Sequence, residues 1–282
     1  MSLSHLGRFW DNLRMTTRPA IPAWRPSPLV LASLGVHGGA LAAVLAQPAA
    51  WPWALGAVAA DHALLAAAGL SPRSRLLGPN WTRLPGTGAG VALTIDDGPD
   101  PEVTPRVLER LDEYRAPATF FCIGERVGRH PDLTRALIER GHAVENHSQH
   151  HMNHFSLLGP RGLASEIERA QESIGAATGR RPRFFRAPAG LRNPFLDPVL
   201  QRLGLTLASW TRRGFDTVNP SVEAVYGRLA RDLGAGDILL LHDGHAARTS
   251  RGVPVILEVL PRLLDAVLEA GLAPVTLSAA LP

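Results

Sequence analysis

Two adjacent carboxylates, Asp96 and Asp97, stand in the run TIDDGP at 94–99, where a Gly-Pro turn follows an aliphatic segment. Neighbouring residues of a strand point in opposite directions, but a sharp turn allows both carboxylates to reach one pocket. One of them could then bind a metal ion while the other remains free to act as a base. Alternatively, the run is a turn that caps the next helix.

Four histidines lie within the run HSQHHMNH at 147–154. Imidazoles at positions i and i+4 can bind one metal ion if the segment begins a helical turn. With Asp97 they would make a set of two histidines and one carboxylate, which leaves positions open for water and substrate. The spacing permits two pairs, His147 with His151 and His150 with His154.

Two further polar groups stand at the ends of predicted strands: Arg186 begins the run RAPAG, and His242 ends the run ILLLH. Taken alone, Arg186 could pair with a surface acid, and His242 could be a histidine of the core. Their positions beside other candidate site groups favour a role in catalysis for both.

Alternating strands and helices from residue 90 onward must position these side chains. Such alternation indicates parallel β/α units with right-handed crossovers, in a barrel or an open doubly wound sheet, whose site lies at the carboxyl ends of the strands. We interpret Cys122, at one such end, as a small buried hydrophobe. The predicted strands are 91–95, 118–122, 143–146, 183–185, 206–209, 238–241 and 274–277, and the predicted helices are 101–114, 131–140, 161–178, 194–202, 222–233 and 254–270.

From about residue 84 to 282 the sequence resembles the NodB-homology polysaccharide deacetylases, carbohydrate esterase family 4, which remove N-acetyl groups from amino sugars. TIDDGP is similar to the first family motif, with Ile95 in place of phenylalanine, and HSQHH is similar to the His-Ser/Thr-x-x-His motif. RAPAG and LLH (240–242) resemble the third and last motifs. The resemblance implies a distorted (β/α)7 barrel and selects His147 and His151 as the ligand pair.

The resemblance also implies a hydrolase in which Asp97, His147 and His151 hold a divalent metal, with zinc expected first and cobalt, nickel or manganese as alternatives. The metal would polarise the amide carbonyl and activate a water molecule. The resemblance further implies that Asp96 is the general base and that Arg186 orients it. His242, with Asp216 beside it, would protonate the leaving amine. The backbone N–H of Ala189 would bind the oxyanion, and Leu240 would line the acyl pocket.

The fourth motif departs from the family pattern. Family members often have Asp-Trp here, whereas this sequence has Trp210 and then Phe215-Asp216-Thr217, so we match Asp216 to the family's aspartate. Thr217 stands where a tryptophan would wall the acetyl pocket, and Ala189 replaces a common aromatic residue. Both changes predict a more open acyl pocket.

Two apolar runs precede this domain. Residues 29–46 carry no formal charge, and 54–70 are interrupted only by Asp61 and His62; prolines and tryptophans lie between the runs. This pattern predicts a transmembrane helical hairpin, with a signal peptide or a buried pair of soluble helices as alternatives. A carboxylate at mid-bilayer is costly, so we expect Asp61 to pair with His37 across the hairpin; alternatively, Asp61 snorkels or faces water in a distorted helix.

The sequence therefore divides into a basic N-terminal segment (1–28), a membrane hairpin (29–71), a linker (72–83) and a catalytic domain (84–282). Arginines flank the hairpin and none lies in its turn. The positive-inside rule then predicts an inner (cytoplasmic) membrane protein with the catalytic domain on the cytoplasmic side. The single cysteine excludes a disulfide framework. No basic stripe interleaved with aromatic residues is present in the sequence, which argues against a nucleic-acid partner.

These features together predict a metal-dependent enzyme that removes N-acetyl groups from a polysaccharide or glycan precursor. One alternative is a deacetylase or deformylase of a lipid-linked amino sugar at the cytoplasmic membrane face. The other is a catalytically silent glycan-binding protein. The expected partners are an N-acetylated glycan or lipid-linked amino sugar, and membrane lipid around the hairpin.

Overall fold

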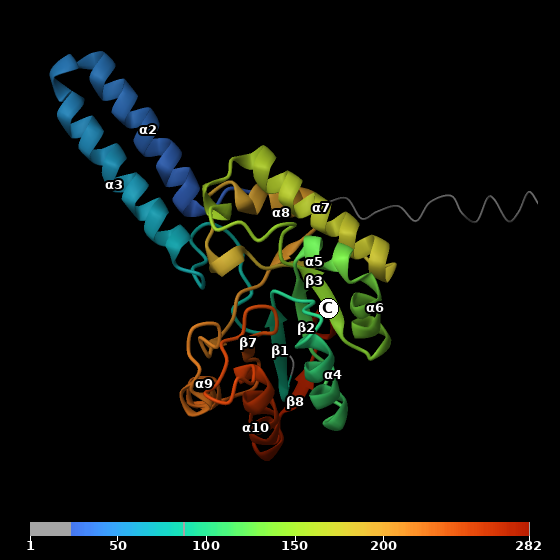
Figure 1. The fold of residues 1–282 in the computed structure, drawn as a ribbon. Helices are drawn as coiled ribbons and strands as arrows, with labels where there is room; N and C mark the ends of the chain where they lie inside the picture. Colours follow the sequence, from blue (N-terminus) through green and yellow to red (C-terminus); the bar gives the residue numbers. More distant parts are fainter. Residues whose placement is uncertain (1–23, 87, 282) are drawn as a thin grey trace, which may run out of the picture.

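The computed structural model describes residues 24–86 and 88–281. Most of the basic segment predicted at 1–28 lies outside the described residues. A helical hairpin projects from an α/β domain (Figure 1). The hairpin consists of α2 (Pro28–Ala46), the short 3-10 helix η1 (Pro48–Ala50) and α3 (Trp51–Leu70).

Within the described residues, eight strands form one sheet in the order β5-β4-β3-β2-β1-β7-β6, and every pairing is parallel. The eighth, β8, pairs with the first half of β1, whereas β2 pairs with the second half. The predicted β/α-barrel class is confirmed. The strands are β1 (Gly90–Asp96), β2 (Thr119–Cys122), β3 (Ala143–Asn146), β4 (Phe184–Phe185), β5 (Thr206–Leu207), β6 (Arg212–Arg213), β7 (Ile238–His242) and β8 (Ala273–Val275).

Helices flank the strands (Figure 1) and connect consecutive strands, except β5 and β6, which are joined by residues 208–211 alone. The six predicted helices are present with small shifts at their ends, and the short α5 was not predicted. The helices are α4 (Thr104–Glu113), α5 (Gly124–Arg129), α6 (Pro131–Glu139), α7 (Pro160–Thr178), α8 (Leu196–Leu203), α9 (Val222–Ala230) and α10 (Val255–Glu269), with 3-10 turns η2 (Phe155–Leu157), η3 (Pro188–Gly190) and η4 (Leu277–Ala280).

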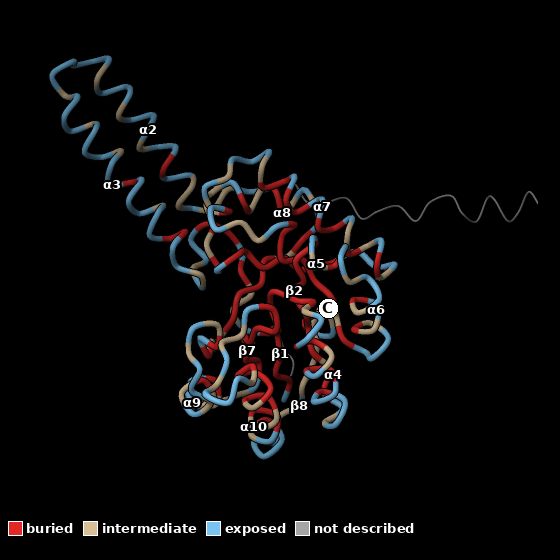
Figure 2. Tube along the Cα trace, viewed as in Figure 1, coloured by how far each residue is buried: buried red, intermediate tan, exposed pale blue. Residues whose placement is uncertain are grey.

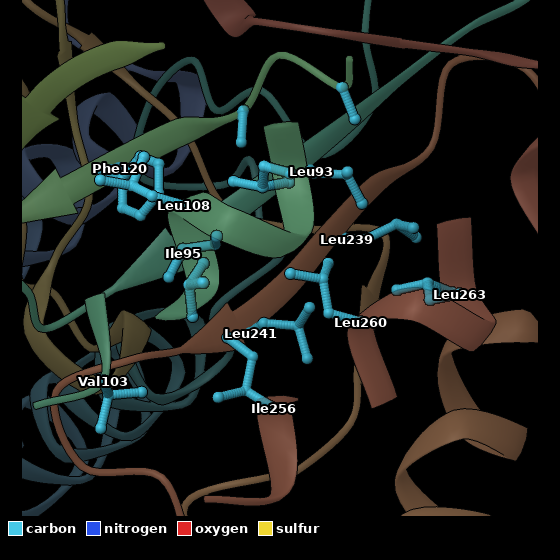
Figure 3. Close-up of a cluster of buried hydrophobic side chains, with 14 of the residues drawn as sticks. Leu93, Ile95, Val103, Leu108, Phe120, Leu239, Leu241, Ile256, Leu260 and Leu263 are labelled. Atoms are coloured by element: carbon cyan, nitrogen blue, oxygen red, sulfur yellow. The ribbon is translucent and has the colours of Figure 1, made fainter. Parts of the chain in front are cut away.

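The alternation of side chains along β1 separates the core from the site. Leu93 and Ile95 belong to the largest apolar cluster, between the sheet and helices such as α4 and α10 (Figure 3). Thr94 and Asp96 therefore point to the opposite, inner face of the curled sheet. Cys122 ends β2 as predicted and belongs to the helix-facing cluster, so its predicted role of a buried hydrophobe is confirmed and it does not line the site.

The segment 72–83, expected as a linker, is hydrogen-bonded to the sheet at the gap between its end strands. Trp81 donates its backbone N–H to Leu207 at 2.9 Å and accepts from Ser209 at 2.8 Å, beside β5. The Thr211 hydroxyl, next to β6, donates to the Thr82 carbonyl at 2.7 Å. These bonds fill the opening that the two end strands leave.

The hairpin exposes its apolar surface. Both helices are long and apolar enough to cross a membrane by length and composition. Figure 2 shows them mostly exposed, and Ser33 is the one buried residue of α2. They are therefore not the buried soluble helix pair considered as an alternative. Large exposed side chains include Leu31, Leu34, Leu41, Leu45, Trp53, Leu55 and Leu64.

Asp61 is the one formally charged residue within α2 and α3. Its carboxylate accepts a hydrogen bond from the Ser33 hydroxyl at 2.7 Å. His37 Nδ1 lies 3.8 Å from the same carboxylate oxygen. The expected pair with His37 is thus present as a longer contact, and the direct partner is Ser33.

Candidate active site

A pocket of about 200 Å³ opens at the carboxyl ends of the strands. The inner faces of β1 and β7 and the loops after β3, β4, β5, β6 and β7 contribute its walls. The residues that line it are Asp96, Asp97, His147, His151, Ala187, Ala189, Gly190, Trp210, Arg213, Thr217, Leu240, His242 and His245.

Asp97, His147 and His151 converge on one point of this pocket. Asp97 Oδ1 lies 3.3 Å from Nε2 of each histidine. The residues 147–151 form an irregular turn, with positive φ at Ser148 (63°) and His151 (50°). The expectation of a helical turn is therefore wrong, although the two imidazoles meet as predicted.

The three residues fit a divalent metal ion. Asp97 Oδ1 is buried and has no hydrogen-bond partner within the described part of the chain. His147 Nδ1 is 2.8 Å from the Arg186 carbonyl oxygen, so a proton on Nδ1 leaves the Nε2 lone pair directed at the centre of the cluster. Burial would raise the pKa of Asp97, but the adjacent imidazoles of His147 and His245 hold it well below its usual value. An ionised carboxylate and two imidazole nitrogens are suitable ligands.

The second histidine pair that the spacing permitted does not form. His150 Nδ1 bonds to the Glu166 carboxylate at 2.7 Å, and its backbone N–H donates to the same side chain at 3.0 Å. His154 is exposed at the start of η2. His147 and His151 are thus the pair in the pocket.

Asp96 lies beside the ligand cluster and is held by Arg186. The guanidinium of Arg186, which is fully buried, donates to Asp96 Oδ1 at 2.6 Å. It also donates to the Thr94 hydroxyl and packs over the Phe121 ring, 4.1 Å from its centroid. The second carboxylate oxygen of Asp96 is 3.7 Å from His147 Nε2 and faces the cluster. Arg186 therefore fixes one oxygen of Asp96 and leaves the other available.

His242 ends β7 on the opposite wall. Its Nδ1 lies 2.9 Å from the buried Asp216 carboxylate, which also accepts the His242 backbone N–H at 2.7 Å. Burial alone would lower the pKa of His242, but the charge of Asp216 and this hydrogen bond raise it to about 9. The imidazole is therefore protonated at neutral pH, with Nε2 as the free donor.

The remaining predicted residues also line the pocket. Ala189 has a left-handed backbone (φ 53°) within η3, and Leu240 is buried on the inner face of β7. Trp210 and Thr217 contribute the adjoining wall. All nine predicted site residues lie in the pocket or, for Arg186 and Asp216, bond to a side chain that does.

His245 is a pocket residue that the sequence did not predict. Its Nδ1 is 3.0 Å from Asp97 Oδ2, and its Nε2 is 3.0 Å from the guanidinium of Arg126. The available signal was its position three residues after His242, in the same strand-end loop.

The glycine that follows the two carboxylates is required by close packing. A Cβ on Gly98 would lie 2.5 Å from a carboxylate oxygen of buried Asp243.

Comparisons with known proteins agree with this geometry. A family model described as "Polysaccharide deacetylase" matches residues 84–208. The chain is 36% identical over 175 residues to the peptidoglycan-N-acetylglucosamine deacetylase of Bacillus cereus (strain ATCC 14579), covering 61% of this chain and 81% of that protein. It is 35% identical over 167 residues to the chitooligosaccharide deacetylase of Bradyrhizobium sp. (strain ANU 289), covering 59% and 75%.

A solved structure with a similar fold is the family 4 carbohydrate esterase from Streptomyces lividans in complex with acetate. It matches with a TM-score of 0.60 and 34% sequence identity, over 66% of this chain and 91% of the other.

Proposed function

This chain belongs to the polysaccharide deacetylase family, and from that premise we propose that its pocket removes N-acetyl groups from amino sugars of a glycan. The family is metal-dependent, and Asp97, His147 and His151 are the residues that would hold the ion. Zinc is the metal we propose, because two imidazoles and one carboxylate with open positions suit it. When bound, the ion would supply Lewis acidity at the substrate carbonyl and at a water molecule.

Two side chains on opposite walls of the pocket, Asp96 and His242, carry out the two proton transfers. Asp96 accepts a proton from the attacking water through the oxygen that Arg186 leaves free. His242, protonated beside Asp216, donates a proton to the leaving amine. In this proposal the backbone N–H of Ala189 stabilises the oxyanion and Leu240 contacts the acetyl methyl group; both residues line the pocket.

One observation carries this proposal: a base with a fixed orientation and a protonated acid flank a single ligand cluster in one pocket. A catalytically silent glycan-binding protein would not need Asp216 to keep His242 charged, nor Arg186 to orient Asp96.

The test is release of acetate from N-acetylglucosamine oligomers by the purified full-length protein in detergent. Activity should disappear after chelation and return with zinc. Asp97→Ala should lose both metal and activity, whereas Asp96→Asn should keep its metal and lose activity at least ~100-fold. Asp232→Asn is a matched control, because Asp232 is exposed and lies outside the pocket. A fully metal-loaded Asp97→Ala protein would refute the ligand assignment.

For the N-terminal part, the proposal is that α2 and α3 anchor the enzyme in the inner membrane with the domain 84–282 on the cytoplasmic side. Exposed apolar surface on both helices supports insertion, and the arginines on either side of the hairpin support this orientation. Reporters fused after residue 282 test it. Fluorescence from a cytoplasmic reporter, with no alkaline phosphatase activity, is the expected result, and the reverse would place the domain outside the cytoplasm.

A further inference from the structure

A second hollow, the arginine groove, adjoins the catalytic pocket where the hairpin meets the barrel. It has a volume of about 490 Å³ and is lined in part by Arg73, Arg213, Arg228, Trp210 and Phe215. Trp210 and Arg213 also line the catalytic pocket. The two hollows therefore share a wall, and one ligand can occupy both.

Three arginines of the groove have no acidic partner among the residues described. Arg73 donates to the Thr211 carbonyl at 3.1 Å, and Arg228 is 3.4 Å from the Gly214 carbonyl. Arg213 makes no ion pair within that same part of the chain. Arg212, by contrast, has an acidic partner: it bonds at 2.6 Å to the Asp237 carboxylate, which it shares with Arg83. The groove thus concentrates about three positive charges beside a pocket that a neutral sugar would enter.

Of the three arginines, Arg213 is the best positioned to bind an anion. Its guanidinium lies 5.4 Å from the Trp210 ring centroid and 4.9 Å from that of Phe215. Its Nε is buried and has no hydrogen-bond partner among the described residues. An unpaired buried donor is costly, and an anion in the groove would satisfy it. The two rings restrict the guanidinium, which reduces the entropy lost when it binds.

The chemistry of the groove favours phosphate over carboxylate. Guanidinium groups bind phosphate oxygens in a bidentate manner, and several of them together match a group with more than one negative charge. A single carboxylate would leave two of the three arginines without a counterion. The ligand class is therefore a phosphate or diphosphate ester.

The position of the groove indicates how such an ester reaches it. Arg73 follows the end of α3 at Leu70 by three residues, so the groove begins where the apolar hairpin ends. Ser71 and Pro72 line its edge, and the Pro72 carbonyl accepts the Ser209 hydroxyl at 2.6 Å. If the hairpin lies in a membrane, the groove lies at the level of the lipid headgroups.

We propose that the arginine groove binds a phosphate or diphosphate esterified to the amino sugar whose acetamido group enters the catalytic pocket. This inference rests on the proposed deacetylase function. Its substrate is a glycosyl phosphate, either soluble or linked to a lipid. The groove would then select the substrate by charge, while the catalytic pocket performs the same hydrolysis on either source.

The first test compares kcat/KM for four forms of N-acetylglucosamine: the methyl glycoside, the 1-phosphate, and the methyl and farnesyl esters of the 1-diphosphate, which differ from each other only in the lipid chain. The wild-type ratio of the phosphate to the methyl glycoside should be at least ~10, and Arg73→Gln or Arg228→Gln should each lower it about fivefold, as for a partly exposed ion pair. Arg231→Gln, an exposed arginine outside the groove, is the matched control. A gain from the farnesyl chain supports a lipid-linked source, and no gain supports a soluble one.

A second measurement separates the groove from the metal and from the proposed reaction. Calorimetric binding of the 1-phosphate to chelator-treated protein should persist without metal and weaken about tenfold in Arg213→Gln. If oligomer hydrolysis fails, the proposed function is wrong and this binding still tests the groove. A wild-type ratio near one, equal ratios in the arginine variants, or binding that requires the metal would overturn the inference.

Discussion

Replacing Asp216 with asparagine should move the alkaline limb of the pH–rate profile. Burial lowers the pKa of His242, and the charge of Asp216 overcomes this and raises the pKa to about 9. A histidine that acts as a general acid supports turnover below its pKa, and activity falls as the pH rises through that value. Wild-type kcat should therefore remain on a plateau through neutral pH and decline near pH 9.

The size of the effect follows from the fraction of protonated imidazole. At pH 7.5 a pKa of about 9 leaves His242 about 97% protonated. Without the Asp216 charge the pKa falls toward the ordinary value of 6.5 or below, where about 10% is protonated. The variant should lose about tenfold in kcat at pH 7.5 and recover most of the loss as the pH is lowered to 6.

The assay is acetate release at saturating substrate between pH 5.5 and 10, with metal content checked at each end. Asp232→Asn makes the same chemical change at an exposed position and should reproduce the wild-type profile. An alkaline limb that stays near pH 9 in Asp216→Asn would refute the reasoning, because Asp216 would then not control the charge of His242.

Three further predictions concern stability of the full chain in detergent. Arg186→Met should lower the free energy of unfolding by about 3–5 kcal/mol, because it leaves the Asp96 carboxylate buried without its partner. Gly98→Ala should cost about 1–3 kcal/mol, since the new Cβ would lie 2.5 Å from a carboxylate oxygen of Asp243. Burial raises the pKa of Glu145 to about 7, so the folded chain binds more protons than the unfolded chain between pH 4.5 and 7. The free energy of unfolding should fall as pH rises across this window, and Glu145→Gln should remove that contribution.

Denaturant unfolding measures all three, and the chain offers controls. Gly128→Ala is the control for Gly98→Ala, because nothing lies within 4 Å of the new Cβ. The stability of this control variant should not decrease. Arg231→Met tests the loss of an exposed arginine and should change little. Equal effects at buried and exposed positions would show that the named contacts are not the cause.

The residues at strand ends could be predicted from the sequence, because apolar runs mark the strands and the first polar residue after each run marks the site. Asp96, Arg186 and His242 were identified in this way; Asp96 and His242 line the pocket, and Arg186 bonds to Asp96. The two-residue strand β6 has no such run: Arg212 and Arg213 form a strand through pairing with β7, which is a tertiary property.

Loop geometry was less accessible to sequence reasoning. His151 reaches Asp97 because Ser148 and His151 adopt left-handed backbone angles, and periodicity carries no information about such a turn. His245 reaches the same carboxylate from the loop after β7, where Gly244 is needed because a Cβ would meet the Asp97 backbone at 2.3 Å. A glycine next to a histidine is too common a pattern to indicate this contact.

Pro72, which follows the hairpin, packs closely against Gly190, so the end of the hairpin is in direct contact with a wall of the catalytic pocket. A Cβ on Gly190 would lie 2.7 Å from Pro72, and Gly190 lines the catalytic pocket. Cutting the chain at residue 84 would remove the hairpin together with part of the protein that encloses the pocket. A soluble fragment meant to retain activity should therefore begin at or before Pro72, with the segment that closes the sheet included.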